Sequence, residues 1–473
     1  MTLLLVVVRF MTYKFAGIPT WGERSKTIAA AITVKPSKCT RQQLRTSRRR
    51  SISRLQSARF DNIHGQMTAD SPTAGATPIL DSAVRPRTRK KKFASILFGA
   101  FVGVCCGAVL ISASTRARGV RNPAEDYILP SFFFAFALTL VVHEFGHLVA
   151  GWMVGFRFDS IAVGPFSVRK EYGRLKVQVR RTLPASGFAG MQVNRVRRLR
   201  RRLLVFISGG PMANLLSAAL VASFFAFEPW STSPLSAAGK IFWKISVIIG
   251  VANFFPFKLG VLYPDGARIA MLLTSRDKSR RWISVSAVGA QSLAGVRPKR
   301  WKRTWLDAAG RVRDDSVDDF TGNWVAYAAA NDRKDAPVAA FHLDCCLGLV
   351  NLLGPSMQDL VVLEAAIFTA WFRQNAVLAE KWKAQVKKPK AVSALMRIRA
   401  EIALHCARRE FAPALTRWQE AIRFIEKLPP TPLKKRMTEG FLEWRDEIQE
   451  RQNLEATKPP ADSISPAQPA IQS

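Results

Sequence analysis

The stretch ILPSFFFAFALTLVVHEFGHLVAGWM, residues 128–153, indicates the fold class of this chain. Nearly all of its side chains are apolar, and about 20 apolar residues suffice to cross a bilayer as a helix. Its second half also carries His143, Glu144 and His147. An ionisable side chain at membrane depth costs at least about 2.5 kcal/mol, so its presence there indicates a function. The stretch therefore predicts a membrane-spanning helix that bears a chemical site.

Three further apolar stretches lie on either side of this one, at about residues 93–113, 203–228 and 241–262. Each has the length of a membrane span or nearly so, and a soluble protein rarely contains four such stretches. The expected fold class is a mainly α, polytopic membrane protein with a four-span core.

A small β element is expected between the second and third spans. The segments FRFDSIAV, SVRKEY and RLKVQVR, within residues 156–180, are short candidate strands separated by Gly-Pro and Tyr-Gly turns. They lie in a strongly basic loop, which places the predicted sheet at the cytoplasmic face of the membrane.

Positive charge gathers beside the expected spans. The net charge is +37, with the cluster RPRTRKKK before the first span and six arginines within residues 195–202 before the third. Cytoplasmic loops next to spans carry such an excess of Lys and Arg. We therefore expect a multi-pass protein of a bacterial inner membrane with both termini in the cytoplasm. This pattern accounts for the charge without nucleic acid, and a membrane-tethered nucleic-acid binder is kept only as an alternative.

Composition divides the chain into four expected parts. Residues 1–92 form a basic, largely disordered leader, in which Met67 opens a polar stretch typical of a true start. Residues 93–275 form the membrane-embedded core and residues 276–455 a cytoplasmic helical domain. Residues 456–473 are rich in Pro, Ser and Ala and are expected to be disordered.

The expected helical domain shows a weak internal repeat. Its repeated positions are Ala414, Trp418 and Ala421, followed by Pro429, with Leu378 and Trp382 upstream. They resemble part of the tetratricopeptide pattern, and a generic helical bundle is the alternative. We expect this domain to bind a protein partner or to regulate the core. Its two isolated histidines, His342 and His405, are interpreted as ordinary helix residues.

The motif HEFGH at residues 143–147 predicts a zinc site. Residues four apart lie on one face of a helix, so the imidazoles of His143 and His147 can hold one Zn²⁺ with Glu144 beside it as general base. A catalytic zinc takes three protein ligands and leaves the fourth position to water. Asp265 is the candidate third ligand, because the expected topology brings it to the same side of the membrane as the two histidines.

Together these motifs resemble the site-2 protease family of intramembrane metalloproteases. The resemblance rests on HEFGH, on SGGPMANLL at 208–216, and on NFFP and PDGAR at 253–256 and 264–268. It covers about residues 127–275, including IAVGPFSV and SGFAGMQ, which are similar to the family's strands beside the substrate groove. A long segment with Lys258 before Asp265, and Ala267 where a glycine is common, depart from the family pattern.

The resemblance implies a zinc endopeptidase that cuts a membrane-protein substrate in or near a transmembrane helix. His143, His147 and Asp265 would bind zinc and Glu144 would be catalytic. Asn214 and Asn253 match family asparagines near the active site and are expected to contact substrate, although Asn214 could equally make a packing hydrogen bond. The alternatives are an inactive membrane scaffold with a helical interaction domain, and a zinc protease whose third ligand is a glutamate of the tail.

Overall fold

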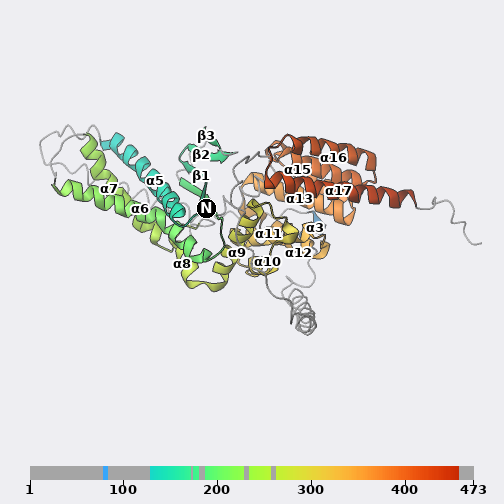
Figure 1. The fold of residues 1–473 in the computed structure, drawn as a ribbon, viewed down its shortest axis with the longest axis horizontal. Helices are drawn as coiled ribbons and strands as arrows, with labels where there is room; N and C mark the ends of the chain where they lie inside the picture. Colours follow the sequence, from blue (N-terminus) through green and yellow to red (C-terminus); the bar gives the residue numbers. More distant parts are fainter. Residues whose placement is uncertain are drawn as a thin grey trace, which may run out of the picture. The chain divides into compact units, whose positions relative to one another are not determined.

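A computed structural model of the chain describes residues 78–83, 128–171, 174–179, 187–227, 234–256 and 263–457. This part is mostly helical and contains one small antiparallel sheet (Figure 1). Of the expected leader it includes only a short segment with α3 (Ile79–Ser82). The predicted span at 93–113, the start at Met67 and the tail beyond residue 457 lie outside the described residues.

Three long helices in the described part are apolar enough to cross a membrane: α5 (Ile128–Met153), α6 (Leu199–Phe227) and α7 (Pro234–Phe254). They run alongside one another (Figure 1). Large apolar side chains point outward from them, among them Phe133 and Leu220, which are 63% and 74% exposed. The predicted spans at 128–153 and 203–228 are thus confirmed as candidate membrane helices.

The last predicted span is placed too late in the chain. It was expected at 241–262, but α7 begins at Pro234 and ends at Phe254, just before Pro256. Lys240 and Lys244 interrupt the apolar run in the sequence. In the structure their ammonium groups lie 5.9 Å from the ring of Phe225 and 6.0 Å from that of Trp243. Long basic side chains can cover apolar surface in this way, so they do not end the helix.

Small residues bring α5 and α6 close together. A Cβ added to Gly146 would lie against the Cβ of Ala213 and the carbonyl oxygen of Gly209. Helices pack this closely in membranes because glycine and alanine let their backbones approach. Between α5 and α7, the hydroxyls of Thr139 and Ser246 are 3.1 Å apart and both side chains are fully buried.

The predicted β element is confirmed as a four-stranded antiparallel sheet in the order β3-β2-β1-β4. Its strands are β1 (Arg157–Val163), β2 (Phe166–Glu171), β3 (Arg174–Val179) and β4 (Gly187–Gln192). β4 pairs with β1 on one side and packs against α5. β3, at the opposite edge, exposes Leu175, Val177 and Val179.

Two helices, α8 (Asp265–Thr274) and α9 (Arg276–Leu293), connect the spans to the rest of the chain. One hydrophobic cluster joins Leu148 of α5, Phe206 of α6, Leu272 of α8 and Trp282 of α9. This core therefore continues across the expected boundary at residue 275, and the four proposed domain limits stay predictions.

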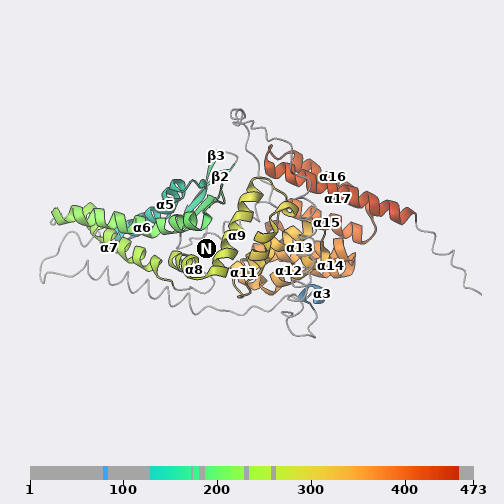
Figure 2. The same ribbon diagram turned by 60° about the horizontal axis from the view of Figure 1, so that its bottom comes forward.

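The remaining described chain is helical (Figure 2). Its α-helices are α10 (Arg303–Gly310), α11 (Val317–Asp332), α12 (Ala336–Gly348), α13 (Pro355–Arg373), α14 (Ala376–Lys383), α15 (Ala394–Ala407), α16 (Phe411–Glu426) and α17 (Pro432–Ala456). Consecutive helices pack together in the pairs α11–α12, α13–α14 and α15–α16. The tetratricopeptide assignment stays a prediction.

Candidate metal centre

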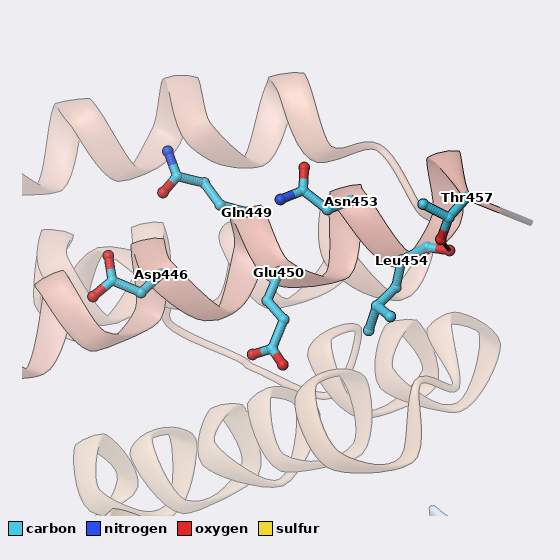
Figure 3. A pocket seen from close by; sticks show the side chains of 6 residues that line it. All are labelled: Asp446, Gln449, Glu450, Asn453, Leu454 and Thr457. Carbon is cyan, nitrogen blue, oxygen red and sulfur yellow. Dashed lines mark hydrogen bonds between the residues drawn. The ribbon is translucent and has the colours of Figure 1, made fainter.

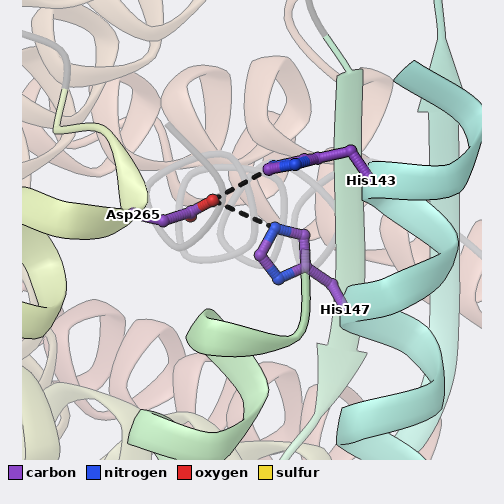
Figure 4. A group of neighbouring side chains, drawn as sticks. All are labelled: His143, His147 and Asp265. Atoms are coloured by element: carbon purple, nitrogen blue, oxygen red, sulfur yellow. Dashed lines mark hydrogen bonds and ion pairs between the residues drawn. The ribbon is translucent and has the colours of Figure 1, made fainter. Parts of the chain in front are cut away.

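Two histidines of α5 and one aspartate of α8 point their polar ends toward one another (Figure 4). Nε2 of His143 lies 3.1 Å, and Nε2 of His147 3.2 Å, from Oδ2 of Asp265. The two histidines are one helical turn apart on α5 and are 6% and 3% exposed. The three ligand atoms all lie within 4.8 Å of one another, a spacing that can hold a metal ion.

The two imidazole–carboxylate separations are compatible with a zinc site. Bonds of about 2.0–2.1 Å from a tetrahedral zinc place two nitrogen or oxygen ligands about 3.4 Å apart. The two imidazole–carboxylate distances, 3.1 and 3.2 Å, are close to that edge length. The donor set of two imidazoles and one carboxylate is also a known catalytic zinc set, which keeps a fourth position open.

The far ring nitrogen of each histidine has a polar neighbour on α6. Nδ1 of His147 lies 2.9 Å from the carbonyl oxygen of Phe206 on α6. An N–H at Nδ1 that donates to this carbonyl leaves the lone pair on Nε2, which faces Asp265. The usual helical partner of the Phe206 carbonyl is the N–H of Gly210, and this nitrogen lies 3.3 Å from the same Nδ1 of His147.

Asn214 of α6 is the polar neighbour of Nδ1 of His143. Its Nδ2 is 3.2 Å from Nδ1 of His143, while its buried Oδ1 has no hydrogen-bond partner among the described residues. The two ends of an amide are assigned from the hydrogen bonds they make. With the amide turned over, Oδ1 accepts from Nδ1–H, which satisfies the orphaned oxygen and leaves Nε2 of His143 free for a metal.

Two glycines make room for the site. A Cβ on Gly210 of α6 would meet Nε2 of His147, and would lie 2.8 Å from Nε2 of His143. A Cβ on Gly187, the first residue of β4, would meet the carboxylate of Glu144. The α6 backbone thus forms one wall of the site, and the start of β4 lies against the expected general base.

Asp265 enters the site at the start of a helix rather than at the end of one. It is the first residue of α8, where a carboxylate is favoured by the helix dipole. Gly266 allows this position, because a Cβ there would meet the backbone of Phe254 and Phe255 at the end of α7. The other end of α8 is held by Arg200, whose Nε donates to the carbonyl of Leu272 at 2.7 Å.

The structure brings together some of the predicted site residues and leaves others apart. His143, His147 and Asp265 converge, and Glu144 is buried beside them. Asn214 contacts His143 itself. Asn253 donates to the carbonyl of Ile249 on its own helix at 2.9 Å, and its expected substrate contact stays a prediction.

Sequence reasoning did not identify Gly210, Gly187 or the Phe206 carbonyl as parts of the site. Gly210 and Pro211 lie within SGGPMANLL, so the motif was noted. Nothing in the motif itself indicates that Gly210 packs against the imidazoles. A backbone carbonyl such as that of Phe206 leaves no signal in the sequence.

The histidines of the tail take no part in this group. In the described part of the chain, the His143–His147–Asp265 group is the one set of metal-ligating side chains with suitable spacing. Nδ1 of His342 lies 2.9 Å from Oδ1 of Asn323, and burial lowers the pKa of His342 to about 3. Nδ1 of His405 lies 2.6 Å from Oε2 of Glu410.

A pocket on α17 is unrelated to the metal centre. Figure 3 shows its six lining side chains: Asp446, Gln449, Glu450, Asn453, Leu454 and Thr457. All six come from one helix and the residue that caps it, and none is a histidine or a cysteine. The pocket therefore adds no group to the chemistry described above.

Comparison with known proteins agrees with the site. The sequence model of peptidase family M50 matches residues 131–353, which contain all three candidate ligands and Glu144. No curated protein and no solved structure matches the chain. The matched region holds the three candidate membrane helices and reaches into the helical tail as far as α12. Residues 131–353 of the chain are thus similar to peptidase family M50, the site-2 protease family of membrane metallopeptidases.

Proposed function

We propose that this protein is an intramembrane zinc endopeptidase. In this proposal His143, His147 and Asp265 hold Zn²⁺. Glu144 is the general base for the hydrolysis of a peptide bond in or near a substrate transmembrane helix. One observation carries it: two imidazoles of a candidate membrane helix and a carboxylate from a separate helix converge with ligand-like spacing. The membrane of residence is proposed to be a bacterial inner membrane with both chain termini in the cytoplasm.

A bound zinc would supply a polarised scissile carbonyl and an activated water. Glu144 takes a proton from that water and returns it to the leaving amine. Glu144 is 6% exposed and its carboxylate lies against Gly187, so its position is defined by packing. In this proposal Nδ1 of each imidazole carries the proton, with the side-chain oxygen of Asn214 and the Phe206 carbonyl as acceptors, so that Nε2 is presented to the site.

A substrate helix must unwind before it can be cut, because its carbonyls are hydrogen-bonded within the helix. We propose that the unwound segment pairs with β4. This strand is at one edge of the sheet, and its first residue lies beside Glu144. Addition of an extended peptide to a free sheet edge is a common mode of recognition.

Replacing Ala189 by proline tests this pairing, since proline removes a backbone donor and breaks strand pairing. Cleavage should fall while bound zinc stays at the wild-type level. Unchanged cleavage by Ala189→Pro would discard β4 as the substrate-binding strand without affecting the zinc proposal.

The proposed activity is tested by co-expressing candidate single-span membrane proteins with the wild type or with Glu144→Gln. A fragment made by the wild type and absent with Glu144→Gln is expected, because loss of a general base lowers rates by about 10²–10⁴-fold. Purified wild type and Glu144→Gln should each carry zinc, and His143→Ala should lose it. A wild-type protein that binds zinc but cuts no substrate would favour the inactive scaffold instead.

A further inference from the structure

Arg268 links the helix that carries Asp265 to the helical tail. It lies one helical turn after Asp265 on α8 and is 6% exposed. Its Nη2 donates to Oδ1 of Asp318 at 3.0 Å, and its Nη1 to Oδ2 of the same carboxylate. Asp318 belongs to α11 and is 7% exposed, so a bidentate ion pair joins the two helices out of contact with water.

Two aromatic rings lie close to the guanidinium of Arg268. The Cζ of Arg268 lies 4.4 Å from the ring centroid of Tyr263 and 5.3 Å from that of Trp282. Burial alone would raise the pKa of Asp318, but the nearby Arg268 outweighs it and holds the pKa below its usual range. Both partners are therefore charged, oriented and enclosed, which gives this contact a defined geometry.

Helix α8 depends on such contacts for its position. It has 10 residues, and a helix of that length is not stable in isolation. Gly266 seats its first turn on the end of α7, and Arg200 caps its last turn. Residues three apart share a helix face, so a shift of Arg268 carries Asp265 with it. The Arg268–Asp318 pair thus holds the turn that presents the carboxylate.

We infer that Asp318 of α11 is a positioning residue for the metal centre and acts through Arg268 on Asp265. The inference rests on the proposed zinc site and extends it. The tail then helps to position the third ligand of the proposed metal centre. A partner that moves α11 would change the position of Asp265 relative to the metal.

The test compares two buried ion pairs in the full-length protein. Asp318→Asn removes the charge that holds Arg268. Asp332→Asn is the matched control, because Asp332 also pairs bidentately with a buried arginine, Arg297, whose Nε lies 3.3 Å from Oδ2 of Asp332. Zinc affinity is measured by competition with a chelator of known affinity, and thermal unfolding of the metal-free protein is measured in parallel.

Asp318→Asn should lower zinc affinity about 10- to 100-fold, as loss of residues that orient metal ligands generally does. Its cleavage rate at saturating zinc should fall as well. Asp332→Asn should lower the thermal unfolding temperature and leave zinc affinity within about twofold of the wild type. A fall in zinc affinity in Asp318→Asn but not in Asp332→Asn would distinguish a positioning role from a general loss of stability.

Wild-type zinc affinity and cleavage in a folded Asp318→Asn protein would overturn the inference and leave the zinc site standing. A wild type that binds no zinc would instead overturn the proposed function. Should Asp318→Asn fail to fold, Arg268→Lys decides by the same measurements, because lysine keeps the charge but cannot make the bidentate pair. Unchanged zinc affinity in Arg268→Lys would then also count against the inference.

Discussion

The three helices apolar enough to cross a membrane differ from the helical tail in the large apolar side chains that they leave exposed. On α5 and α6, Phe133 and Leu220 are 63% and 74% exposed, whereas the polar residues Thr139 and Asn214 are fully buried. In the tail, by contrast, a large aromatic residue such as Trp382 is 0% exposed, while polar residues such as Asn323 are buried as well. Lipid tails are as apolar as leucine, so helices in a bilayer associate through small residues and polar contacts, whereas water drives apolar side chains inward.

This difference explains where the candidate metal centre is built. Its two histidines lie where polar side chains are already turned inward, on the face of α5 that Gly210 of α6 covers. The tail contributes no ligand within the described residues, yet its Asp318 reaches α8 beside the site. Helices α5 and α8 thus supply the candidate ligands, and the tail helps to hold α8 in place.

The largest expected effect concerns the core of the tail. Trp382→Ala should lower the free energy of unfolding of the tail by about 3–5 kcal/mol, because a fully buried aromatic side chain is removed. Leu220→Ala in α6 should change stability by no more than about 0.5 kcal/mol in a bilayer, since Leu220 faces outward. Denaturant titration of the protein in lipid discs measures both. An equal loss in the two variants would show that this face of α6 packs against protein.

A smaller effect is expected at the wall of the metal centre. Gly210→Ala places a methyl group against both imidazoles and should lower cleavage about 100-fold, with weaker zinc binding. Gly289→Ala on α9 is the control, because a Cβ there meets nothing within 4 Å. The control should keep full zinc content and cleavage. Unchanged zinc binding in Gly210→Ala would contradict the close approach of α6 to the two histidines.

The smallest expected effect is a pH dependence of the stability of the helical tail. Burial, with a further contribution from Arg313, lowers the pKa of His342 to about 3, against a usual value of 6.5. Between these values the unfolded chain binds a proton that the folded chain does not. The contribution of His342 to stability is therefore complete above pH 6.5 and is lost toward pH 3, at about 1.4 kcal/mol per pH unit.

Unfolding of the wild type and His342→Gln at pH 7 and pH 5 tests this dependence. Between these two values the variant should lose about 2 kcal/mol less stability than the wild type. Parallel losses in both proteins would mean that His342 is not kept neutral by the fold.

Local patterns predicted much of the architecture. The span at 128–153 and the strands at 156–180 were predicted because hydrophobicity, turn residues and helical periodicity act over a few neighbouring residues. The start of α7 was misplaced for the same reason. Lys240 looks like an interruption in the sequence, and only the nearby ring of Phe225 shows why the helix continues through it.

The contacts around the candidate site could not be predicted from such local sequence patterns. Asn214 could be noted, but whether it faces substrate or His143 depends on how α5 and α6 pack. The approach of Gly187 to Glu144 and the pairing of Arg268 with Asp318 join residues far apart in the chain. No spacing rule in the sequence indicates either contact.

The sequence by itself determined that the chain contains helices apolar enough to span a membrane and that His143 and His147 share one helix face, because both properties follow from the order of neighbouring residues. Only the tertiary structure decided that Oδ2 of Asp265 meets Nε2 of both histidines, and which residues support that meeting. The physical reason is that α8 is too short to set its own position, so its neighbours on α6, α7 and α11 determine where its first carboxylate points.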